Sequence, residues 1–600
     1  MFVTPSAILP AVRVAALVKQ IPEFEQMSLG PDGRLAREGL PLEMSAYDRR
    51  AVAKGVELAA STGGTCTVVT LGPPSAEDVL REAIAFGADE GLHVSDPSFA
   101  GSDTLATARA LAATLERHGP FDLILVGRNS VDADTGQVGP ELAQLLDLPF
   151  ATGVKHLEMR EGSVRVGLEL DDEWVDATVA LPAVLSTAER LIDPCKIKDP
   201  DVWATVDPAR IRRISAAELG EGPWGQAGSP TWVGETRTEV VERVGLRPTG
   251  TVVEQVARAV EFLKDRGTLL PGSPVEADEV VPRPPHGDQA VVVIAEAGRD
   301  RLTRELLGGA ARLAEHLHGH VVAIDGGPEQ SSTDEWASWG ADHIVRIEGA
   351  TAPEDVATGV ERWVAAHAAP VVLTGSTAWG REVASRVAAE IGAGLTGDAV
   401  GLTIDAGRLV AWKPAFGGTL VAAVTAWSPV QMATVRPGVL PLLEPRAEHG
   451  ISADSLRVDP RRRVVVLARR REDDIDVLAN ADVVIGVGQG VHPSDYGRLD
   501  GLRRLLGAEM AATRKVTDVG WMPHARQIGI TGHAIAPRLY VAIGTSGKYN
   551  HTVGVRSAGT ILAINPDPDA PMFECADVGL VGDWQSVVPE LERQLGAVLA

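Results

Sequence analysis

The stretch Leu539-Tyr540-Val541-Ala542-Ile543-Gly544-Thr545-Ser546-Gly547 decides the fold of the C-terminal part of the chain. Five apolar residues in a row, without polar alternation, predict a buried strand of a parallel sheet. The glycines and hydroxyl-bearing residues that follow predict a loop at the carboxyl end of that strand. Open α/β sheets bind ligands at this edge, where glycines let the backbone approach a phosphate and N–H groups and hydroxyls donate to it.

Two more polar clusters lie close to this stretch. One is Gln527-Ile528-Gly529-Ile530-Thr531-Gly532, and the other is Ala563-Ile564-Asn565-Pro566-Asp567-Pro568, which closes a second apolar run. Glycine, serine and asparagine also end ordinary strands and cap ordinary helices, so one such cluster has a bland explanation. Three in series, with Arg514 and His551 nearby in sequence, predict a nucleotide-cofactor crevice.

Composition disfavours several classes of protein. With 600 residues the chain is too long for one hydrophobic core, and we expect three or four domains. A formal net charge of −25 argues against a nucleic-acid or anionic-membrane surface, because attraction to phosphate needs a basic face. Three distant cysteines suggest neither disulfides nor a metal site, and no segment has the length of a membrane span. We therefore expect a cytoplasmic location and a reduced setting.

The first 270 residues alternate apolar strands with amphipathic helices, as a parallel α/β sheet requires. From residue 210 the pattern loosens into an arm that closes with a helix at 253–266. The segment 270–288 is rich in proline, glycine and acids, which is typical of a linker, and a second α/β unit begins at Ala290. Strands of the first unit are expected at residues 12–18, 65–71, 123–126 and 183–186.

The two α/β units resemble each other. Residues 121–128 and the helix through 141–146 are echoed, at a nearly constant offset, by residues 370–376 and a helix through 387–391. Similarity between two such units can arise without common ancestry. In either case we expect two similar sheets that pack against each other across a pseudo-twofold axis.

Beyond these patterns, the motifs resemble those of the electron transfer flavoproteins. The C-terminal clusters are similar to the alpha-subunit patterns Q-x-G-Q-T-G, G-I-S-G-x-x-x-H and A-I-N-x-D-P in both order and spacing. Arg381, in a G-R-x-x-A-S-R-V-A setting, also resembles the alpha subunit, as do residues 414–418 and 431–438. The N-terminal unit resembles the beta subunit at residues 18–20, 45–48, 71–74 and 132–140.

The resemblance implies a fusion of two usually separate subunits, beta first, and such tethering fixes their stoichiometry. It implies an α/β fold with two similar parallel-sheet domains of the nucleotide-binding type (adenine nucleotide alpha hydrolase-like) and a C-terminal Rossmann-like FAD-binding domain. The expected parts are a beta-like domain with its C-terminal arm at 1–270, a linker at 271–288, an alpha-subunit N-terminal-like domain at 289–455 and the FAD-binding domain at 456–600.

The resemblance also implies which residues bind FAD. Arg514 is the candidate for stabilising an anionic flavin semiquinone, because a permanently charged guanidinium beside the ring favours the anion. His551 either donates a hydrogen bond to the flavin carbonyl or is a structural histidine at a strand end. The expected FAD-binding set is Thr513, Arg514, Gln527, Ile528, Gly529, Thr531, Gly544, Ser546, Gly547, His551, Asn565, Asp583 and Gln489.

Two positions depart from the family pattern. The G-G-R-G turn is here Gly488-Gln489-Gly490, which lacks a second arginine near the flavin, and Ile530 replaces the glutamine of Q-T-G. Both changes remove favourable interactions with a reduced, anionic flavin, so we expect a lower semiquinone potential than in ordinary members. Arg526 and Lys548 are the candidates to compensate.

A second nucleotide site is implied in the first unit. The small and acidic residues 132–140 follow a strand, and they either cradle an adenine nucleotide with backbone N–H groups or form an acidic turn that caps the helix from Val138. In the family this loop binds AMP, or a second FAD in electron-bifurcating members. The expected set is Leu17, Lys19, Ser45, Leu71, Asp132, Asp134, Thr135, Gly136, Gln137 and Val138.

Three functions follow from the resemblance. The leading one is an electron carrier that accepts electrons on FAD from flavin-dependent dehydrogenases, such as the acyl-CoA dehydrogenase type, and passes them to a quinone oxidoreductase. The others are an electron-bifurcating, NADH-oxidising flavoprotein with two FAD, and a nucleotide-binding protein whose flavin site has decayed. Leu191 is implied as an exposed anchor for partner dehydrogenases, although a leucine packed beneath a proline turn fits equally. No HExxH or GxSxG motif occurs, so no catalytic residue is expected.

Overall fold

The computed structural model describes most of the chain. By their contacts the residues form two compact units: unit 1 comprises residues 1–238 and 279–470, and unit 2 comprises residues 239–278 and 471–600. We call residues 1–238 the first half of unit 1 and residues 279–470 its second half. The described residues are 10–22, 41–130, 133–171, 173–197, 199–238, 243–269, 276–284, 287–327, 332–415, 420–447, 450–471, 477–478, 481–529, 532–533 and 535–599.

The first half is built on a ten-stranded sheet covered by helices on both faces. Along β1, Ala15 and Leu17 face one hydrophobic cluster, while Val14 and Ala16 face the clusters on the other side. Burial on both faces explains why these strands are continuously apolar. In sheet order the strands are β11 (Ile211–Ile214), β5 (Glu90–Val94), β4 (Thr65–Leu71), β1 (Arg13–Leu17), β6 (Leu123–Gly127), β10 (Ala183–Thr187), β7 (Phe150–Arg160), β8 (Ser163–Glu169), β9 (Glu173–Ala180) and β25 (Val464–Arg471). The main helices are α1 (Asp48–Thr62), α2 (Glu77–Phe86), α3 (Thr104–His118) and α4 (Val138–Leu145).

The second half repeats this topology. In its seven-stranded parallel sheet, the strands are ordered about the first strand of the half as those of the ten-stranded sheet are ordered about β1. Three antiparallel strands of a smaller sheet correspond to β7, β8 and β9. The seven strands are β24 (Ser452–Arg457), β16 (His343–Glu348), β15 (His320–Asp325), β14 (Ala290–Ala295), β17 (Val371–Gly375), β22 (Gln431–Val435) and β18 (Gly394–Ala399). The smaller sheet is β12 (Thr231–Thr238), β21 (Leu420–Ala426), β20 (Arg408–Ala415) and β19 (Gly401–Asp405), and the helices are α9 (Asp300–Leu317), α10 (Thr333–Trp339), α11 (Pro353–Ala366) and α12 (Ala378–Ile391).

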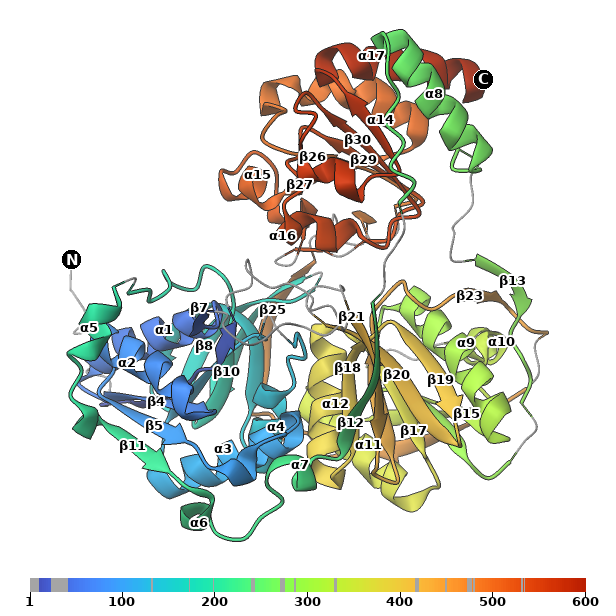
Figure 1. Cartoon of the computed structure of the whole chain (residues 1–600). Helices are drawn as coiled ribbons and strands as arrows, with labels where there is room; N and C mark the ends of the chain where they lie inside the picture. The colour runs from blue at the N-terminus through green and yellow to red at the C-terminus, as the bar shows by residue number, and fades with distance from the viewer. Residues whose placement is uncertain are drawn as a thin grey trace, which may run out of the picture. The chain divides into compact units, whose positions relative to one another are not determined.

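The two halves exchange edge strands. Strand β12 leaves the first half and pairs antiparallel with β21 of the second half, beside which it runs in Figure 1. Strand β25, at the end of the second half, adds to β9 of the first half. The internal repeat is thus visible in topology, but the halves meet through helices rather than sheet against sheet. In that contact Gln144 Nε2 donates to Glu390 Oε2 at 3.0 Å, and Arg386 Nη2 donates to the carbonyl of Leu148 at 3.4 Å.

Unit 2 contains a six-stranded parallel sheet. Its first three strands in sequence lie one after another from the centre toward one edge, and its last three lie from the centre toward the other edge. This is the order of a Rossmann fold, as the sequence predicts. The predicted strands at 539–543 and 560–564 are β29 and β30, which pair in parallel. In sheet order the strands are β28 (Gln527–Ile528), β27 (Glu509–Thr513), β26 (Val483–Val487), β29 (Leu539–Ile543), β30 (Thr560–Asn565) and β31 (Val578–Val581). The helices are α8 (Val252–Asp265), α14 (Asp500–Leu506), α15 (Arg514–Asp518), α16 (Tyr549–Thr552) and α17 (Trp584–Leu599).

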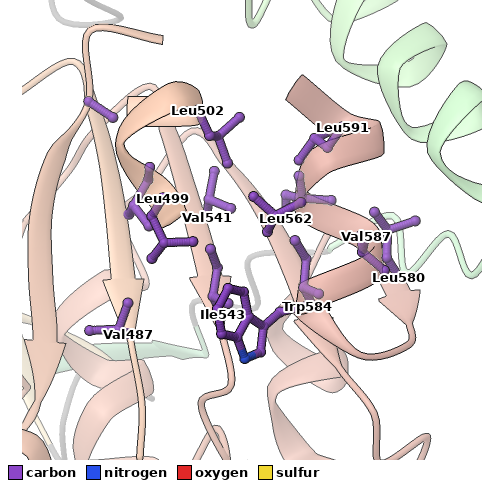
Figure 2. Close-up of a cluster of buried hydrophobic side chains, with 14 of the residues drawn as sticks. Val487, Leu499, Leu502, Val541, Ile543, Leu562, Leu580, Trp584, Val587 and Leu591 are labelled. Carbon is purple, nitrogen blue, oxygen red and sulfur yellow. The ribbon is translucent and has the colours of Figure 1, made fainter. Parts of the chain in front are cut away.

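One face of this sheet packs against α14, α17 and α8. Figure 2 shows Val541 and Ile543 of the central strand β29 facing Leu499, Leu502 and Trp584 in this cluster of buried side chains. Trp584 also has a polar role, because its Nε1 donates to the carbonyl of Gly490 at 3.1 Å. The hydrophobic core therefore holds one of the loops at the carboxyl edge of the sheet.

The helix that ends the predicted first domain belongs to unit 2. Helix α8 packs beside α17 (Figure 1), and Leu246 forms a bridge with Val578. The fully buried Asp577 accepts hydrogen bonds from Arg243 at 2.8 Å and Arg266 at 3.2 Å. The four-part division of the chain stays a prediction. Its linker contains strand β13 (Glu276–Val280) among its described residues.

Candidate functional site

The strand order of unit 2 reverses between β26 and β29, and ligands of open α/β sheets bind at such a switch point. The loops that follow these strands touch through their backbones. Gly488 N–H donates to the carbonyl of Ile543 at 3.0 Å, and Gly490 N–H donates to that of Gly544 at 3.3 Å. A Cβ on Gly488 would overlap the carbonyl of Gly544, so only glycine permits this approach.

The third loop of the crevice is tied to the second. Asn565, at the end of β30, donates from Nδ2 to the carbonyl of Thr545 at 2.8 Å, and its Oδ1 accepts the N–H of Asp567 at 2.9 Å. Gly547 has φ +72°, and a Cβ there would overlap the backbone of Met572. The structure thus brings Gly544, Gly547 and Asn565 of the predicted set together at one edge of the sheet.

His551 is buried beneath this edge. Its Nδ1 lies 3.3 Å from the carbonyl of Ile528 and its Nε2 lies 2.8 Å from the hydroxyl of Tyr540. A carbonyl only accepts, so Nδ1 carries the proton and Nε2 accepts from Tyr540. Burial lowers the pKa of His551 to about 4, so the ring is neutral. Both nitrogens are engaged within the protein, which favours the structural alternative; donation to a flavin carbonyl stays a prediction.

The residues on β27 and β28 surround the same edge. Gln527 is buried, and its Oε1 accepts from the hydroxyl of Thr517 at 2.6 Å. Thr513 ends β27 and precedes α15, whose first residue is the exposed Arg514. Arg514 Nε donates to Asp518 Oδ2 at 3.3 Å, so a carboxylate accompanies its charge.

Three other residues of the predicted FAD-binding set are exposed. Ser546 and Gln489 are exposed on their loops, and Asp583 is exposed before α17, where its Oδ1 accepts the N–H of Gln585 at 3.0 Å. Gly529 has φ +135° and donates to the carbonyl of His533 at 3.1 Å. The predictions for Thr531 and Ile530 lie outside the described residues. Of the two candidates to compensate, Arg526 is bound to Glu509 at 2.9 Å and Lys548 is exposed.

Thr545 is a residue of this crevice that the predicted set omits. Its side chain is buried, and its Oγ1 has no hydrogen-bond partner in the part of the chain that the structure describes. Buried hydroxyls are usually paired, so an orphaned one beside a switch point fits a site that a ligand completes. The sequence signal was present, because threonine stands where the family pattern has isoleucine.

The first half of unit 1 has its own switch point between β1 and β6. After β1, Lys19 N–H donates to Asp48 at 2.8 Å and Lys19 Nζ donates to Ser130 Oγ, in the loop after β6, at 3.3 Å. Two buried polar atoms here, Ser45 Oγ and Asn129 Oδ1, find no partner among the described residues. Leu17 and Leu71 lie at the carboxyl ends of neighbouring strands. These residues fit a polar ligand such as a nucleotide.

The loop at residues 133–137 closes this crevice against the second half. Asp134 accepts from Asn129 Nδ2, while Thr135 and Gly136 lie beside Gly397 and Arg381. Gln137 is buried before Val138, the first residue of α4, and its Nε2 donates to the carbonyl of Leu395 at 3.4 Å. Asp132 lies outside the described residues.

At the corresponding switch point of the second half, between β14 and β17, two carboxylates bond to residues that begin α12. Asp171, from the first half, accepts the N–H of Ala378 at the start of α12 at 2.5 Å. Glu296 accepts from the hydroxyl of Thr377 at 2.6 Å, and Thr377 in turn accepts the N–H of Gly380 at 2.9 Å. Carboxylates therefore hold the first turn of α12.

Leu191 is half-buried and packs against the cluster beneath β7, β8 and β9, which favours the packed alternative over an exposed anchor. No helix of the described residues has both the length and the apolar character to cross a membrane. Within the same residues, no group of three histidine, cysteine or acidic side chains is arranged to hold a metal ion.

The fold and the glycine-lined switch point of unit 2 are those of an α/β protein that binds a nucleotide cofactor. A family model described as electron transfer flavoprotein domain matches residues 32–220 and 291–458. A second, described as electron transfer flavoprotein FAD-binding domain, matches residues 477–556. The chain therefore belongs to the electron transfer flavoprotein family, and FAD is the cofactor of unit 2.

Relatives match the two parts of the chain separately. Electron transfer flavoprotein subunit beta of Thermoanaerobacterium thermosaccharolyticum is 34% identical over 261 residues, which cover 43% of this chain and 100% of the relative. Subunit alpha of the same organism is 34% identical over 304 residues, 48% of this chain and 92% of the relative. Protein FixB of Rhizobium meliloti is 36% identical over 305 residues, 48% of this chain and 86% of the relative. The chain is thus a beta–alpha fusion, as its motifs predict.

Bound FAD supplies reversible one- and two-electron chemistry. Glycine loops of this kind would let the backbone approach a phosphate of the cofactor. The buried Tyr540–His551 pair holds the peptide of Ile528 in place.

Proposed function

We propose that this protein is a single-chain electron carrier that accepts electrons on FAD from flavin-dependent dehydrogenases and passes them to a quinone oxidoreductase. The glycine-lined switch point of unit 2, with its orphaned Thr545 hydroxyl, is the observation that carries the proposal. Family membership supplies the class of donor and acceptor. We further propose that Thr513, Gln527 and the loop residues of the predicted set contact FAD.

Arg514 is proposed to tune the flavin. It follows β27, which lies next to β26, so it starts at the same sheet edge as the crevice loops. A guanidinium there favours the anionic semiquinone. The carboxylate of Asp518 at 3.3 Å offsets part of that charge, which supports the expected lower potential.

The first half is proposed to bind a second adenine nucleotide at its own switch point. Ser45 Oγ and Asn129 Oδ1, which lack a partner within the described part of the chain, support this, because an adenosine offers hydroxyl and amino groups that bond to such atoms. With AMP bound at this switch point, the protein is the electron carrier proposed above. A second FAD gives the second candidate function, an NADH-oxidising, electron-bifurcating flavoprotein.

The deciding experiment is the visible spectrum and acid-released nucleotide content of the purified full chain, followed by titration with NADH. One FAD with one AMP, and no bleaching by NADH, is the result we expect. Two FAD with rapid bleaching would establish the bifurcating alternative. A colourless protein that cannot be reconstituted with FAD would reject both and leave a decayed nucleotide-binding protein.

A further inference from the structure

Thr545 occupies a constrained position at the flavin crevice. It follows Gly544 at the carboxyl end of β29, one of the two strands that flank the switch point. The carbonyl of Thr545 is held by Asn565 Nδ2 at 2.8 Å, and a Cβ on Gly488 of the facing loop would come within 2.7 Å of the Thr545 Cα. The backbone of this residue is therefore fixed from two sides.

The side chain of Thr545 is in a different situation from its backbone. Only 1% of the residue is exposed, and its Oγ1 lacks a partner among the described residues. A hydroxyl buried without a partner destabilises a folded protein, so folded proteins seldom keep one unless a ligand, ion or water completes it. The ligand of this crevice, FAD, carries phosphate, ribityl and carbonyl oxygens, and all of them accept hydrogen bonds.

We propose that Thr545 Oγ1 donates a hydrogen bond to an oxygen of bound FAD. The proposal rests on FAD binding by unit 2. It adds a hydroxyl donor at a site where Gln489 and Ile530 replace an arginine and a glutamine of the family pattern, and where Thr545 itself replaces an isoleucine. The chain thus retains hydrogen bonding to the cofactor from a different strand end.

The test is Thr545→Val in the full chain, a change that removes the hydroxyl and nearly keeps the shape. Loss of an unpaired buried group stabilises the apoprotein, while loss of a donor weakens FAD binding. We expect a higher melting temperature of the apoprotein by calorimetry and about a tenfold higher Kd for FAD, by quenching of flavin fluorescence. A more stable apoprotein together with weaker FAD binding is the result expected of a hydroxyl whose hydrogen-bond partner is the cofactor.

Thr517→Val is the matched control, because the hydroxyl of this buried threonine already donates to Gln527 Oε1 at 2.6 Å. Its apoprotein should melt at a lower temperature. Thr545→Ser keeps the hydroxyl and should keep the affinity for FAD. A Thr545→Val apoprotein that melts lower, as it would if water occupied the site, overturns the inference, and so does an unchanged Kd. Failure of the wild type to bind FAD would instead reject the proposed function.

Discussion

His551 offers a direct measure of how the flavin crevice is held. Burial lowers the pKa of His551 to about 4, against 6.5 for an exposed histidine. Between these two values the unfolded chain binds a proton that the folded chain does not. Acidification therefore favours unfolding, and the stability that neutral His551 contributes is present above pH 6.5 and is lost as the pH falls toward 4.

The size of this effect follows from the two pKa values. From pH 7 to pH 5 the unfolded histidine becomes almost fully protonated, while the folded one stays neutral. The resulting loss of unfolding free energy is about 2 kcal/mol. It should appear only in proteins that keep the histidine, because glutamine at this position does not titrate.

The assay compares the wild type with His551→Gln at pH 7 and pH 5, using urea unfolding at fixed FAD concentration, followed by flavin release. We expect the wild type to lose about 2 kcal/mol more than the variant on acidification. Tyr540→Phe is the control, since it removes the hydrogen bond of 2.8 Å between Tyr540 and His551 but keeps the His551 ring that titrates. Equal losses in the wild type and His551→Gln would refute the buried, neutral histidine.

Three further predictions concern the flavin and the fusion. Arg514→Ala should lower the semiquinone potential by about 40 mV in a potentiometric titration, since a charge beside the ring contributes ~1 kcal/mol in solvent; an unchanged potential would exclude Arg514 from that role. Gly547→Ala should abolish FAD retention, because the new Cβ overlaps Met572, whereas Gly520→Ala, with φ +75° and nothing within 4 Å, isolates the cost of the backbone conformation alone. Polypeptides of residues 1–269 and 276–600, expressed together with one tag, should co-purify at equal stoichiometry through the exchanged strands β12 and β25 and through α8, which packs within unit 2; independent elution would contradict this.

The parallel strands were predictable because their signal is local. Residues 65–71 and 539–543 match β4 and β29 residue for residue, since a strand buried on both faces is rich in apolar and β-branched residues. The glycine loops after β26 and β29 were predictable for a similar reason, because close approach of two backbones leaves glycine in the sequence. Fold class and flavin crevice therefore follow from short stretches of chain.

Pairing between distant segments was not predictable from the same signals. The arm at residues 231–238 gives no sign that it will pair with β21, and the segment 243–269 gives none that it will join unit 2 through Asp577. The arginine run before β25 likewise gives no sign of its partners, yet Arg463 Nη2 binds Glu354 at 2.6 Å. These pairings depend on residues that lie far away in the sequence.

Within the site, sequence located the residues but not their hydrogen bonds. The orientation of His551 depends on Tyr540, which the strand pattern marks only as an apolar core position. Thr545 follows a glycine as an ordinary turn residue does, and what distinguishes it from the exposed Ser546 is a buried hydroxyl with no partner among the residues that the structure describes. A hydrogen bond is a property of two side chains in three dimensions, and neither motif spacing nor residue type reports it.

The repeated halves show how one fold is used in two ways. In the first half, Ser45 Oγ and Asn129 Oδ1 have no partner among the described residues at the switch point, so a ligand there would gain hydrogen bonds. At the equivalent place in the second half, Asp171 and Glu296 bond to the first turn of α12 through Ala378 N–H and the Thr377 hydroxyl. A phosphate would need those donors and would meet two negative charges. The same topology therefore supports the proposed nucleotide site in the first half and disfavours one in the second half, whose Gly397 and Arg381 instead lie beside the loop at 133–137.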